Sequence, residues 1–195
     1  MKKSKWSILK FFGLERLVWN VEWAAGRWNY LDAINLASVE IVRKYARNGT
    51  IIELGCGSGA LAASIGHQLY KNYKGIDISD VAIKRARSRR LDRCEFEVGA
   101  MESAHIGPAD LIIIKEALYY LEPDQQITLL RKCLNRVAPD GAVYITVHDA
   151  AQFVWLLCRV REAGSVIEER RIQTGINELV HIVIGSGPPT DRLGT

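Results

Sequence analysis

The chain carries a glycine-rich loop directly after a short apolar run, within the stretch GTIIELGCGSGALAAS of residues 49–64. Gly55, Gly57 and Gly59 occupy alternate positions. Glu53 stands two residues ahead of the first of them. Glycines let a ligand approach backbone N–H groups closely, and a loop between a strand and a helix is a common place for such contacts. We therefore expect a ligand-binding loop here, with an acid beside it.

A second acid, Asp77, ends the next apolar run, YKGIDI. In dinucleotide-binding folds a carboxylate at this place accepts the hydroxyls of a ribose. A nucleoside-containing cofactor accounts for both acids, whereas a loop that merely turns tightly accounts for neither. The letters GCGSGA also fit the permissive dinucleotide pattern, so an NAD-dependent oxidoreductase is the alternative. Glu53 argues against that alternative, because an anion beside the loop suits a cationic ligand better than a pyrophosphate.

Apolar runs of strand length alternate with stretches of helical periodicity. Strands are expected over residues 50–54, 73–78, 94–98, 109–115, 142–147, 165–172 and 178–185, and helices over residues 59–70, 80–91, 123–137 and 150–163. This alternation predicts an α/β fold with a doubly wound parallel sheet. The turn sequence QTGIN separates the last two strands, which predicts an antiparallel hairpin at the end of the sheet.

Length and composition are those of one soluble globular domain: 195 residues, of which 48% are hydrophobic and 25% charged. The cysteines are widely spaced and form no C-x-x-C pair; they are Cys56, Cys94, Cys133 and Cys158. This spacing is typical of buried thiols in a reducing compartment. We therefore expect a cytoplasmic protein without a zinc site or a disulfide framework.

Positive charge is concentrated at the start of the chain. Residues 1–20 hold five cations and one acid, a net charge of +4, while the remainder holds 21 cations and 21 acids. A neutral body argues against nucleic acid as the main partner. One basic run, residues 84–93, falls near the end of a predicted helix, where cations are favourable and solvated. A phosphate-binding patch is the alternative for this run.

Residues 1–29 form a basic, amphipathic and aromatic segment. Phe11, Leu14, Val18 and Val21 share one helical face. Three roles are open: a helix that closes over the cofactor cleft, an aromatic surface that stacks on the acceptor, or peripheral contact of residues 1–20 with an anionic membrane. The aromatic residues concerned are Trp19, Trp23, Trp28 and Tyr30. We expect a domain over residues 30–185 and a disordered tail over residues 186–195.

Four stretches, IELGCGSGALA, GIDIS, DLIIIKEALYYL and LNRVAPDGAVYITV, resemble the class I S-adenosylmethionine-dependent methyltransferases. The resemblance covers roughly residues 30–185. It implies a doubly wound, Rossmann-like seven-stranded sheet in the order 3-2-1-4-5-7-6, with the last strand antiparallel. It also implies S-adenosyl-L-methionine as the cofactor. The alternatives that we retain are an oxidoreductase and a protein that binds this cofactor without catalysis.

By this resemblance, Glu53 and the loop backbone hold the methionine end of the cofactor, and Asp77 binds its ribose. The family often has an acid for the adenine amino group where Ala100 stands here, so Met101 and Glu102 become the adenine-side candidates. A surface position for Glu102 is the alternative. The complete set of expected cofactor-binding residues is Glu53, Gly55, Cys56, Gly57, Gly59, Asp77, Ile78, Met101, Glu102 and Lys115.

Residues on the acceptor side are expected past the ends of the middle strands, where open α/β sheets bind ligands. Glu116, Tyr120 and His148 occupy these places. Glu116 can pair with an ammonium group or take its proton, and His148 can act as a base near neutral pH. Structural alternatives are a helix cap for Glu116 and a backbone partner for His148. No oligomeric state is predicted.

The acceptor is expected to be a small molecule that bears an amine, a sugar or a hydroxyl. The run EALYYL is similar to that of nodulation-type N-methyltransferases, which act on the amine of a chito-oligosaccharide. Methyl transfer is an in-line displacement, so positioning of the two reactants supplies most of the catalysis.

Overall fold

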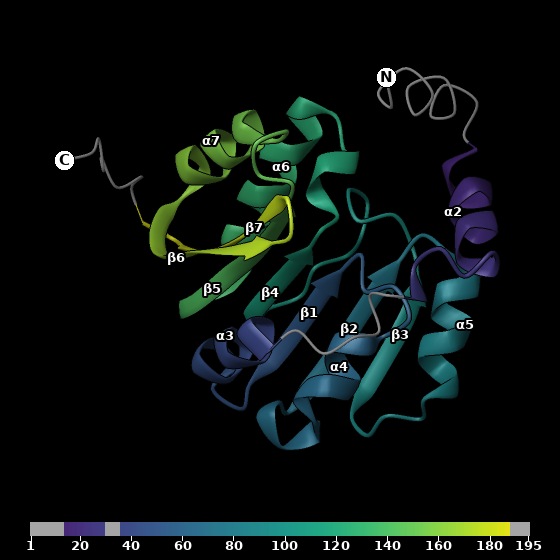
Figure 1. Cartoon of the computed structure of the whole chain (residues 1–195). Coiled ribbons are helices and arrows are strands. Elements are labelled where there is room, and N and C mark those ends of the chain that lie inside the picture. Colours follow the sequence, from purple (N-terminus) through teal and green to yellow (C-terminus); the bar gives the residue numbers. More distant parts are fainter. Residues whose placement is uncertain (1–13, 30–35, 188–195) are drawn as a thin grey trace.

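A computed structural model describes residues 14–29 and 36–187 (Figure 1). Seven strands form one sheet in the order β3-β2-β1-β4-β5-β7-β6. The strands are β1 (Thr50–Leu54), β2 (Asn72–Asp77), β3 (Cys94–Val98), β4 (Ala109–Lys115), β5 (Val137–His148), β6 (Ser165–Thr174) and β7 (Asn177–Gly185). β1 to β5 pair in parallel, and β7 runs antiparallel to both β5 and β6. The predicted fold class, strand order and terminal hairpin are confirmed.

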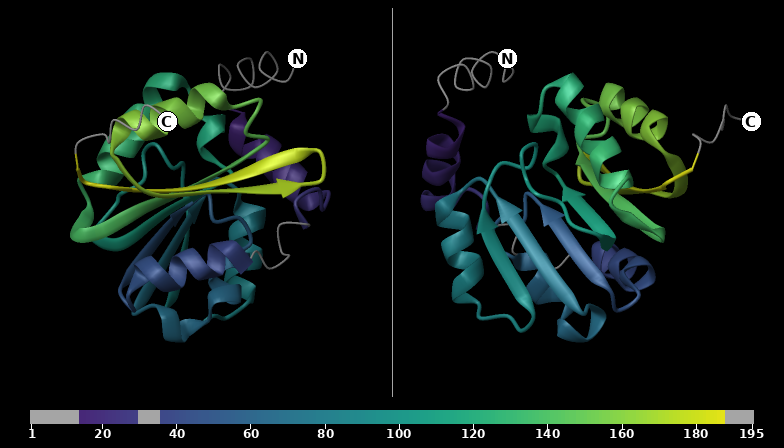
Figure 2. Two further views of the ribbon diagram at one scale, coloured as in Figure 1. Left: turned by 60° about the vertical axis from the view of Figure 1, so that its left-hand side comes forward. Right: turned by 180° about the vertical axis from the view of Figure 1, so that it is seen from behind.

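Helices cover both faces of the sheet (Figure 2). The elements are α2 (Glu15–Ala24), α3 (Leu36–Ala46), α4 (Ala60–Ile65), η2 (His67–Leu69), α5 (Asp80–Ser88), η3 (Leu118–Tyr120), α6 (Pro123–Leu134) and α7 (Val154–Ala163). One buried cluster joins α3, α4 and α5 to the sheet, and a second joins α6 and α7 to its other face. The sheet is therefore sandwiched between two helical layers, as its apolar central strands require.

The central strand β4 is apolar on consecutive positions because both of its faces are covered. Leu111 and Ile113 pack in the cluster with α3, α4 and α5. Ile112 and Ile114 pack in the cluster with α6 and α7. All four are fully buried. The polar ends of the parallel strands are thereby left as the only part of the central sheet that can meet a ligand.

Two helices begin at residues that cap their first turn. Ser79 caps α5, where its hydroxyl accepts from the Ala82 N–H at 3.2 Å. α6 begins at Pro123 and carries a capping box between Glu122 and Gln125. Each cap satisfies backbone donors that have no partner within the helix.

Several element boundaries differ from expectation: α5 ends at Ser88 and α6 at Leu134, where helix is predicted to residues 91 and 137, and α7 begins at Val154, where helix is predicted from residue 150. Two further differences involve α4 and β5. α4 ends at Ile65, because Gly66 adopts φ +75° and ψ 151°, and only a 3-10 turn follows where the sequence predicts helix to residue 70. β5 begins at Val137, so the PDG sequence of residues 139–141 lies within an irregular part of the strand. The register of the β4–β5 pairing shifts in this region, between Ala109 and Leu111 of β4.

The cysteine prediction is partly wrong. Cys56 and Cys133 are buried, whereas Cys94 is half-buried and Cys158 is exposed. All four are free thiols. Cys158 lies on the outer side of α7, where a small apolar residue is tolerated in water without a buried contact.

The basic run of residues 84–93 is largely structural. Arg87 donates from Nε and Nη2 to the carbonyl of Phe96, at 2.9 and 2.7 Å. Arg89 donates from Nε to the carbonyl of Ser58 at 2.7 Å. These two arginines therefore fix β3 and the glycine loop to α5 and are not spare cations for a phosphate.

The chain ends differ in part from expectation. Ser186 donates its hydroxyl to the carbonyl of Leu134 at 2.8 Å, so the expected tail is anchored at its first residue. Residues 188–195, Tyr30 and the expected helical positions before residue 14 lie outside the described residues. Within the described ranges, no helix is both long enough and apolar enough to cross a bilayer.

Candidate cofactor and acceptor site

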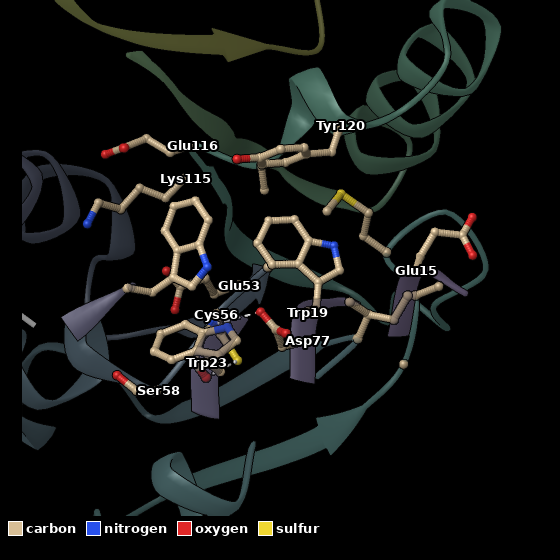
Figure 3. A pocket seen from close by; sticks show the side chains of 18 of the residues that line it. Glu15, Trp19, Trp23, Glu53, Cys56, Ser58, Asp77, Lys115, Glu116 and Tyr120 are labelled. Carbon is tan, nitrogen blue, oxygen red and sulfur yellow. Dashed lines mark hydrogen bonds between the residues drawn. The ribbon is translucent and has the colours of Figure 1, made fainter. Parts of the chain in front are cut away.

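A cavity opens at the carboxyl ends of β1, β2 and β4 (Figure 3). Its lining includes every expected cofactor-side residue except Gly59. Two of the three expected acceptor-side residues, Glu116 and Tyr120, line it as well. Residues distant in the sequence thus meet in one place, at the edge of the sheet where α/β folds bind ligands.

The glycine loop requires glycine at two cavity positions. Gly55 and Gly57 have φ values of +77° and +53°, a region that side chains disfavour. A Cβ atom on Gly55 would lie 2.7 Å from the Cβ of Ala117. A Cβ atom on Gly57 would lie 2.8 Å from Cζ2 of Trp23. Glycine is therefore required at both positions by the backbone conformation and by the close packing of Ala117 and Trp23.

Gly59 serves packing. It has φ +72° and precedes α4, and a Cβ atom there would lie 2.9 Å from Cζ of Phe96 and 3.1 Å from Cβ of Ala86. Gly59 does not line the cavity. The structure therefore places this expected cofactor contact under the loop, where it lets α4 and α5 approach each other.

Glu53 is a buried acid at the cavity wall. The Tyr73 hydroxyl donates to its Oε2. Burial raises the pKa of Glu53 to about 7, against the opposing effects of the Tyr73 hydrogen bond and of Lys115. A cation that binds beside Glu53 would stabilise the ionised carboxylate. It would thereby offset the cost of desolvation that raises the pKa of this acid.

Asp77 fastens the loop to the end of β2. Its carboxylate accepts from the backbone N–H groups of Gly57 and Ser79, each at 2.9 Å. Burial raises the pKa of Asp77, and these two hydrogen bonds oppose the shift. Part of the side chain stays accessible and belongs to the cavity lining. Acceptor capacity of the carboxylate that these two bonds do not use is therefore available at the cavity wall.

The segment after β3 forms another wall of the cavity. Gly99 is held by a hydrogen bond from its N–H to the carbonyl of Asp77 at 2.9 Å. Ala100, Met101 and Glu102 follow in the lining. The Glu102 side chain is exposed at the rim, which leaves both expected roles for it compatible with its position.

Glu116 and Tyr120 form the wall after β4. Glu116 has φ +51°, and its N–H donates to the carbonyl and to the hydroxyl of Thr146, both at 3.1 Å. A non-glycine residue in this region is strained, and such strain is typical of functional positions. Tyr120 lies in η3 and faces the cavity, whereas Tyr119 points away and stacks on Phe153 at 4.6 Å.

His148 is not brought to the cavity. It is the last residue of β5 and pairs with Leu179 of β7. The last β4–β5 pair is Lys115 with Thr146, so His148 lies beyond the strand that carries the acceptor wall. The expectation that His148 serves as a base at this site is corrected on these grounds, since its side chain is absent from the lining.

α2 contributes a wall that the sequence left undecided. Glu15, Trp19 and Trp23 of α2 line the cavity, together with Trp28 in the turn after the helix. The Trp19 ring lies 5.4 Å from that of Trp28, and it meets Tyr120 edge-on at 4.8 Å. The helical spacing of Glu15, Trp19 and Trp23 was the available signal, because positions four apart share a face.

Hydrogen bonds dock α2 on α5. The Asp80 carboxylate accepts from the Arg16 guanidinium and from Asn20. Arg16 and Asn20 lower the pKa of Asp80. The Arg85 guanidinium donates to the carbonyl of Trp23 at 2.8 Å and lies 5.7 Å from its ring centroid. α2 is therefore fixed in one orientation, with its aromatic face toward the cavity.

Trp23 gives the first test of this arrangement. It is 4% exposed and packs on Gly57. Trp23→Ala is expected to remove about 3 kcal/mol from the stability of α2, which speeds amide exchange in that helix roughly 100-fold. Hydrogen exchange followed by mass spectrometry measures this. The control Val154→Ala, at an exposed position of α7, should leave α2 unchanged. Unaltered α2 exchange in Trp23→Ala would contradict the docking.

The chain is similar to known methyltransferases. A family model described as a methyltransferase domain matches residues 46–178. The ubiquinone biosynthesis O-methyltransferase of Neisseria meningitidis serogroup C (strain 053442) is 27% identical over 131 residues, which cover 63% of this chain and 54% of that protein. The chain thus spans about half the length of this curated relative.

Two solved structures show the same fold. One is the N-methyltransferase NodS from Bradyrhizobium japonicum WM9 in complex with S-adenosyl-L-homocysteine; its TM-score is 0.61 at 22% identity, covering 75% of this chain and 85% of that one. The other is an S-adenosylmethionine-dependent methyltransferase from Clostridium acetobutylicum ATCC 824, with a TM-score of 0.67 at 11% identity, covering 87% of this chain and 99% of that one.

Proposed function

Because the chain belongs to the class I S-adenosylmethionine-dependent methyltransferases, we propose that it transfers the cofactor's methyl group to a nitrogen of a small-molecule acceptor. The observation that carries the proposal is the cavity itself. Two acids from neighbouring strands, Glu53 and Asp77, flank a glycine cradle there, and a separate wall with Glu116 and Tyr120 stands beside them.

The residues present fit a cationic nucleoside. Glu53 meets an ammonium group, since a buried carboxylate with a pKa near 7 gains most from a cationic partner. Asp77 accepts the ribose hydroxyls with the carboxylate capacity left over from its two backbone bonds. The loop residues Gly55 and Gly57 line the cavity beside these two acids. A pyrophosphate would instead bring its charge toward Glu53.

The bound cofactor supplies a methyl group that is already activated by a positive sulfur. The protein's own part is to align the acceptor nitrogen with that group and to exclude water. The aromatic rings of Trp19 and Tyr120 provide the apolar wall for this. Glu116 pairs with the protonated acceptor amine and takes one proton from it, which frees the electron pair of the nitrogen; the nitrogen then bonds to the methyl carbon as the bond from that carbon to sulfur breaks.

Charge favours nitrogen over oxygen at the acceptor. The cavity lining carries five carboxyl side chains and one ammonium group, that of Lys115. Such a wall attracts cationic amines and repels anions. An ammonium acceptor is both attracted by this charge and deprotonated by a single carboxylate such as Glu116, whereas a neutral hydroxyl is a much weaker acid and gains nothing from the negative wall. A hydroxyl acceptor is the second candidate, favoured by the O-methyltransferase activity named for the Neisseria relative.

The experiment that tests the function is methyl transfer from S-adenosylmethionine labelled in its methyl group. The full chain is incubated with pools of amines, amino sugars and phenols, and labelled products are separated. Label in an amine product supports the proposal, and label only in an ether product supports the second candidate. Cofactor binding with no label in any pool would favour a non-catalytic binding protein.

Glu116 is the residue to test on the acceptor side. Glu116→Gln is expected to lower kcat/KM for the identified amine roughly 10- to 150-fold, the value of a hydrogen bond to a charged group. Cofactor affinity should stay within about twofold, because this side chain faces the acceptor wall. Glu162→Gln, at an exposed position of α7, is the matched control. Unchanged kcat/KM would remove Glu116 from the mechanism.

A further inference from the structure

Two aromatic rings meet at a right angle at the cavity wall. Trp19 comes from α2 and Tyr120 from η3, and both line the cavity (Figure 3). Their planes make an angle of 88°, with 4.8 Å between the ring centroids. In such an edge-to-face pair, a face of one ring and the adjoining face of the other bound a corner, which we call the aromatic corner. Trp28 adds a third ring, 5.4 Å from that of Trp19.

Both chain segments that build the aromatic corner also bring an acid to the cavity. Glu15 precedes Trp19 by about one turn on the same face of α2. Glu116 stands just before η3, which holds Tyr120. Both acids are half-buried and line the cavity, where Lys115 is the one basic side chain among the described residues. Ring faces and negative charge are therefore combined in one wall.

Ring faces and carboxylates favour different ammonium groups. The face of an aromatic ring attracts a cation within about 6 Å of its centroid, and this attraction needs no N–H donor. A carboxylate gains most from an ammonium group that donates hydrogen bonds to it. Each methyl group on the nitrogen removes one N–H donor, keeps the positive charge and adds apolar surface. Methylated ammonium groups therefore suit the aromatic corner better than unmethylated ones do.

We infer that the aromatic corner holds an acceptor nitrogen that already carries methyl groups, so that the enzyme methylates one nitrogen repeatedly until it is a quaternary ammonium. The inference rests on the proposed function, methyl transfer to the nitrogen of a small molecule. It names the substrate class, which is a primary amine together with its monomethylated and dimethylated derivatives.

Each round of transfer leaves a cation for the rings to hold. Glu116 takes one proton from the ammonium group, and the freed electron pair bonds to the methyl carbon while the electrons of the carbon–sulfur bond go to sulfur. The nitrogen is then positive again, and the sulfur of S-adenosylhomocysteine is neutral. Glu116 passes its proton to water before the next round. The series ends when the nitrogen has no proton left to lose.

Binding of a matched ligand pair tests the aromatic corner without catalysis. Choline and 3,3-dimethyl-1-butanol have nearly the same shape, but only choline is charged. Each is titrated into the full chain saturated with S-adenosylhomocysteine, and ligand-observed NMR follows its methyl protons. Choline should bind at least about fivefold more tightly. Trp19→Leu should reduce this preference roughly 2- to 30-fold, and Trp19→Phe, which keeps a ring face, should retain most of it.

Trp155→Leu is the matched control for these variants. Trp155 is a half-buried tryptophan of α7 that does not line the cavity. This change removes an indole of similar exposure from another part of the molecule, so the preference for choline should equal that of the original chain. Calorimetric binding of S-adenosylhomocysteine verifies that each variant is folded.

Product analysis tests the repeated transfer. The amine identified by labelling and its monomethyl and dimethyl derivatives are supplied separately with S-adenosylmethionine, and mass spectrometry counts the methyl groups added. The dimethylated amine should react with a kcat/KM no lower than that of the primary amine. Trp19→Leu should lower kcat/KM for the dimethylated amine roughly 2- to 30-fold more than for the primary amine.

Two results would overturn the inference. Equal affinities for choline and 3,3-dimethyl-1-butanol would mean that the rings are only an apolar wall. A monomethylated amine that is not converted would mean a single transfer. Failure of the proposed function has a different signature, label in ethers alone or in no product. It would also end the case for repeated N-methylation, while the choline comparison would still decide what the aromatic corner binds.

Discussion

Asp77→Ala is expected to weaken S-adenosylmethionine binding by roughly 100- to 10,000-fold. The carboxylate of Asp77 accepts two backbone N–H groups of the apo protein, and we propose that it also accepts the ribose hydroxyls. Each hydrogen bond to a charged group contributes roughly 1.5 to 3 kcal/mol, and the ribose takes two of them. Isothermal titration calorimetry with S-adenosylmethionine and S-adenosylhomocysteine measures the loss.

Controls separate a lost ligand contact from a disordered loop. Asp77→Asn keeps the side-chain size but only one acceptor oxygen, so either the Gly57 or the Ser79 N–H loses its partner; urea unfolding measures that loss of stability separately from the expected loss of affinity. Asp92→Ala, at an exposed position before β3, should bind as the original chain does. Asp77→Asn with unchanged affinity would contradict the ribose role.

Glu53→Gln is expected to have opposite effects on stability and binding. Glu53 is buried with a raised pKa of about 7, so the ionised side chain destabilises the apo protein above that pH. Glutamine keeps the acceptor oxygen for Tyr73 and removes the charge. The variant should therefore unfold at higher urea than the original chain at pH 8, while its cofactor affinity falls roughly 10- to 150-fold.

The sign of the pH dependence follows from proton uptake. Between pH 4.5, the ordinary pKa of this acid, and about 7, the folded protein binds the Glu53 proton more tightly than the unfolded chain does. Stability from this group therefore falls as pH rises through that window and levels off above it, by about 3 kcal/mol at most. Urea unfolding at several pH values should show the fall in the original chain and lose it in Glu53→Gln.

Cofactor affinity should depend on pH in the reverse direction. A cationic ligand requires ionised Glu53, so the Kd should rise up to tenfold for each pH unit below about 7, and the variant should lack this slope. Glu95→Gln, an exposed change on β3, is the control. Equal slopes in the original chain and in Glu53→Gln would contradict the assignment of Glu53 to the cofactor's ammonium group.

The fold was predictable because its signals are local and repeated. The central strands are apolar runs, several strands end beside a glycine or a helix cap, and the strands alternate with amphipathic stretches as far as the terminal hairpin. The QTGIN turn alone indicated that the last two strands pair antiparallel. Strand order came from the resemblance, because no local signal states which strands are neighbours.

The sequence predicts a cavity residue well when its position at a strand end suffices to place it there. It predicts less well when the direction of the side chain decides. Glu53, Asp77 and Glu116 follow directly from the ends of parallel strands. Gly59 and His148 did not reach the cavity, because a loop glycine can serve packing and β5 pairs beyond the end of β4. The positions of Gly59 and His148 depend on tertiary contacts that local sequence patterns do not reveal.

The orientation of α2 could be predicted only in part. The spacing of its residues separates an aliphatic side from an aromatic and polar side. Which side faces the protein is decided by Asp80 and Arg85 of α5, which bind Arg16, Asn20 and the Trp23 carbonyl. Burial of aliphatic residues would have favoured the opposite orientation.

The most direct test of the cofactor site is one calorimetric series. S-adenosylmethionine, S-adenosylhomocysteine and NAD are titrated into the original chain, Glu53→Gln and Asp77→Asn. We predict that the two sulfur nucleosides bind, that both variants weaken them, and that NAD gives no heat of binding. Binding of NAD in place of the sulfur nucleosides, or equal affinities in all three proteins, would contradict a cationic nucleoside held between Glu53 and Asp77.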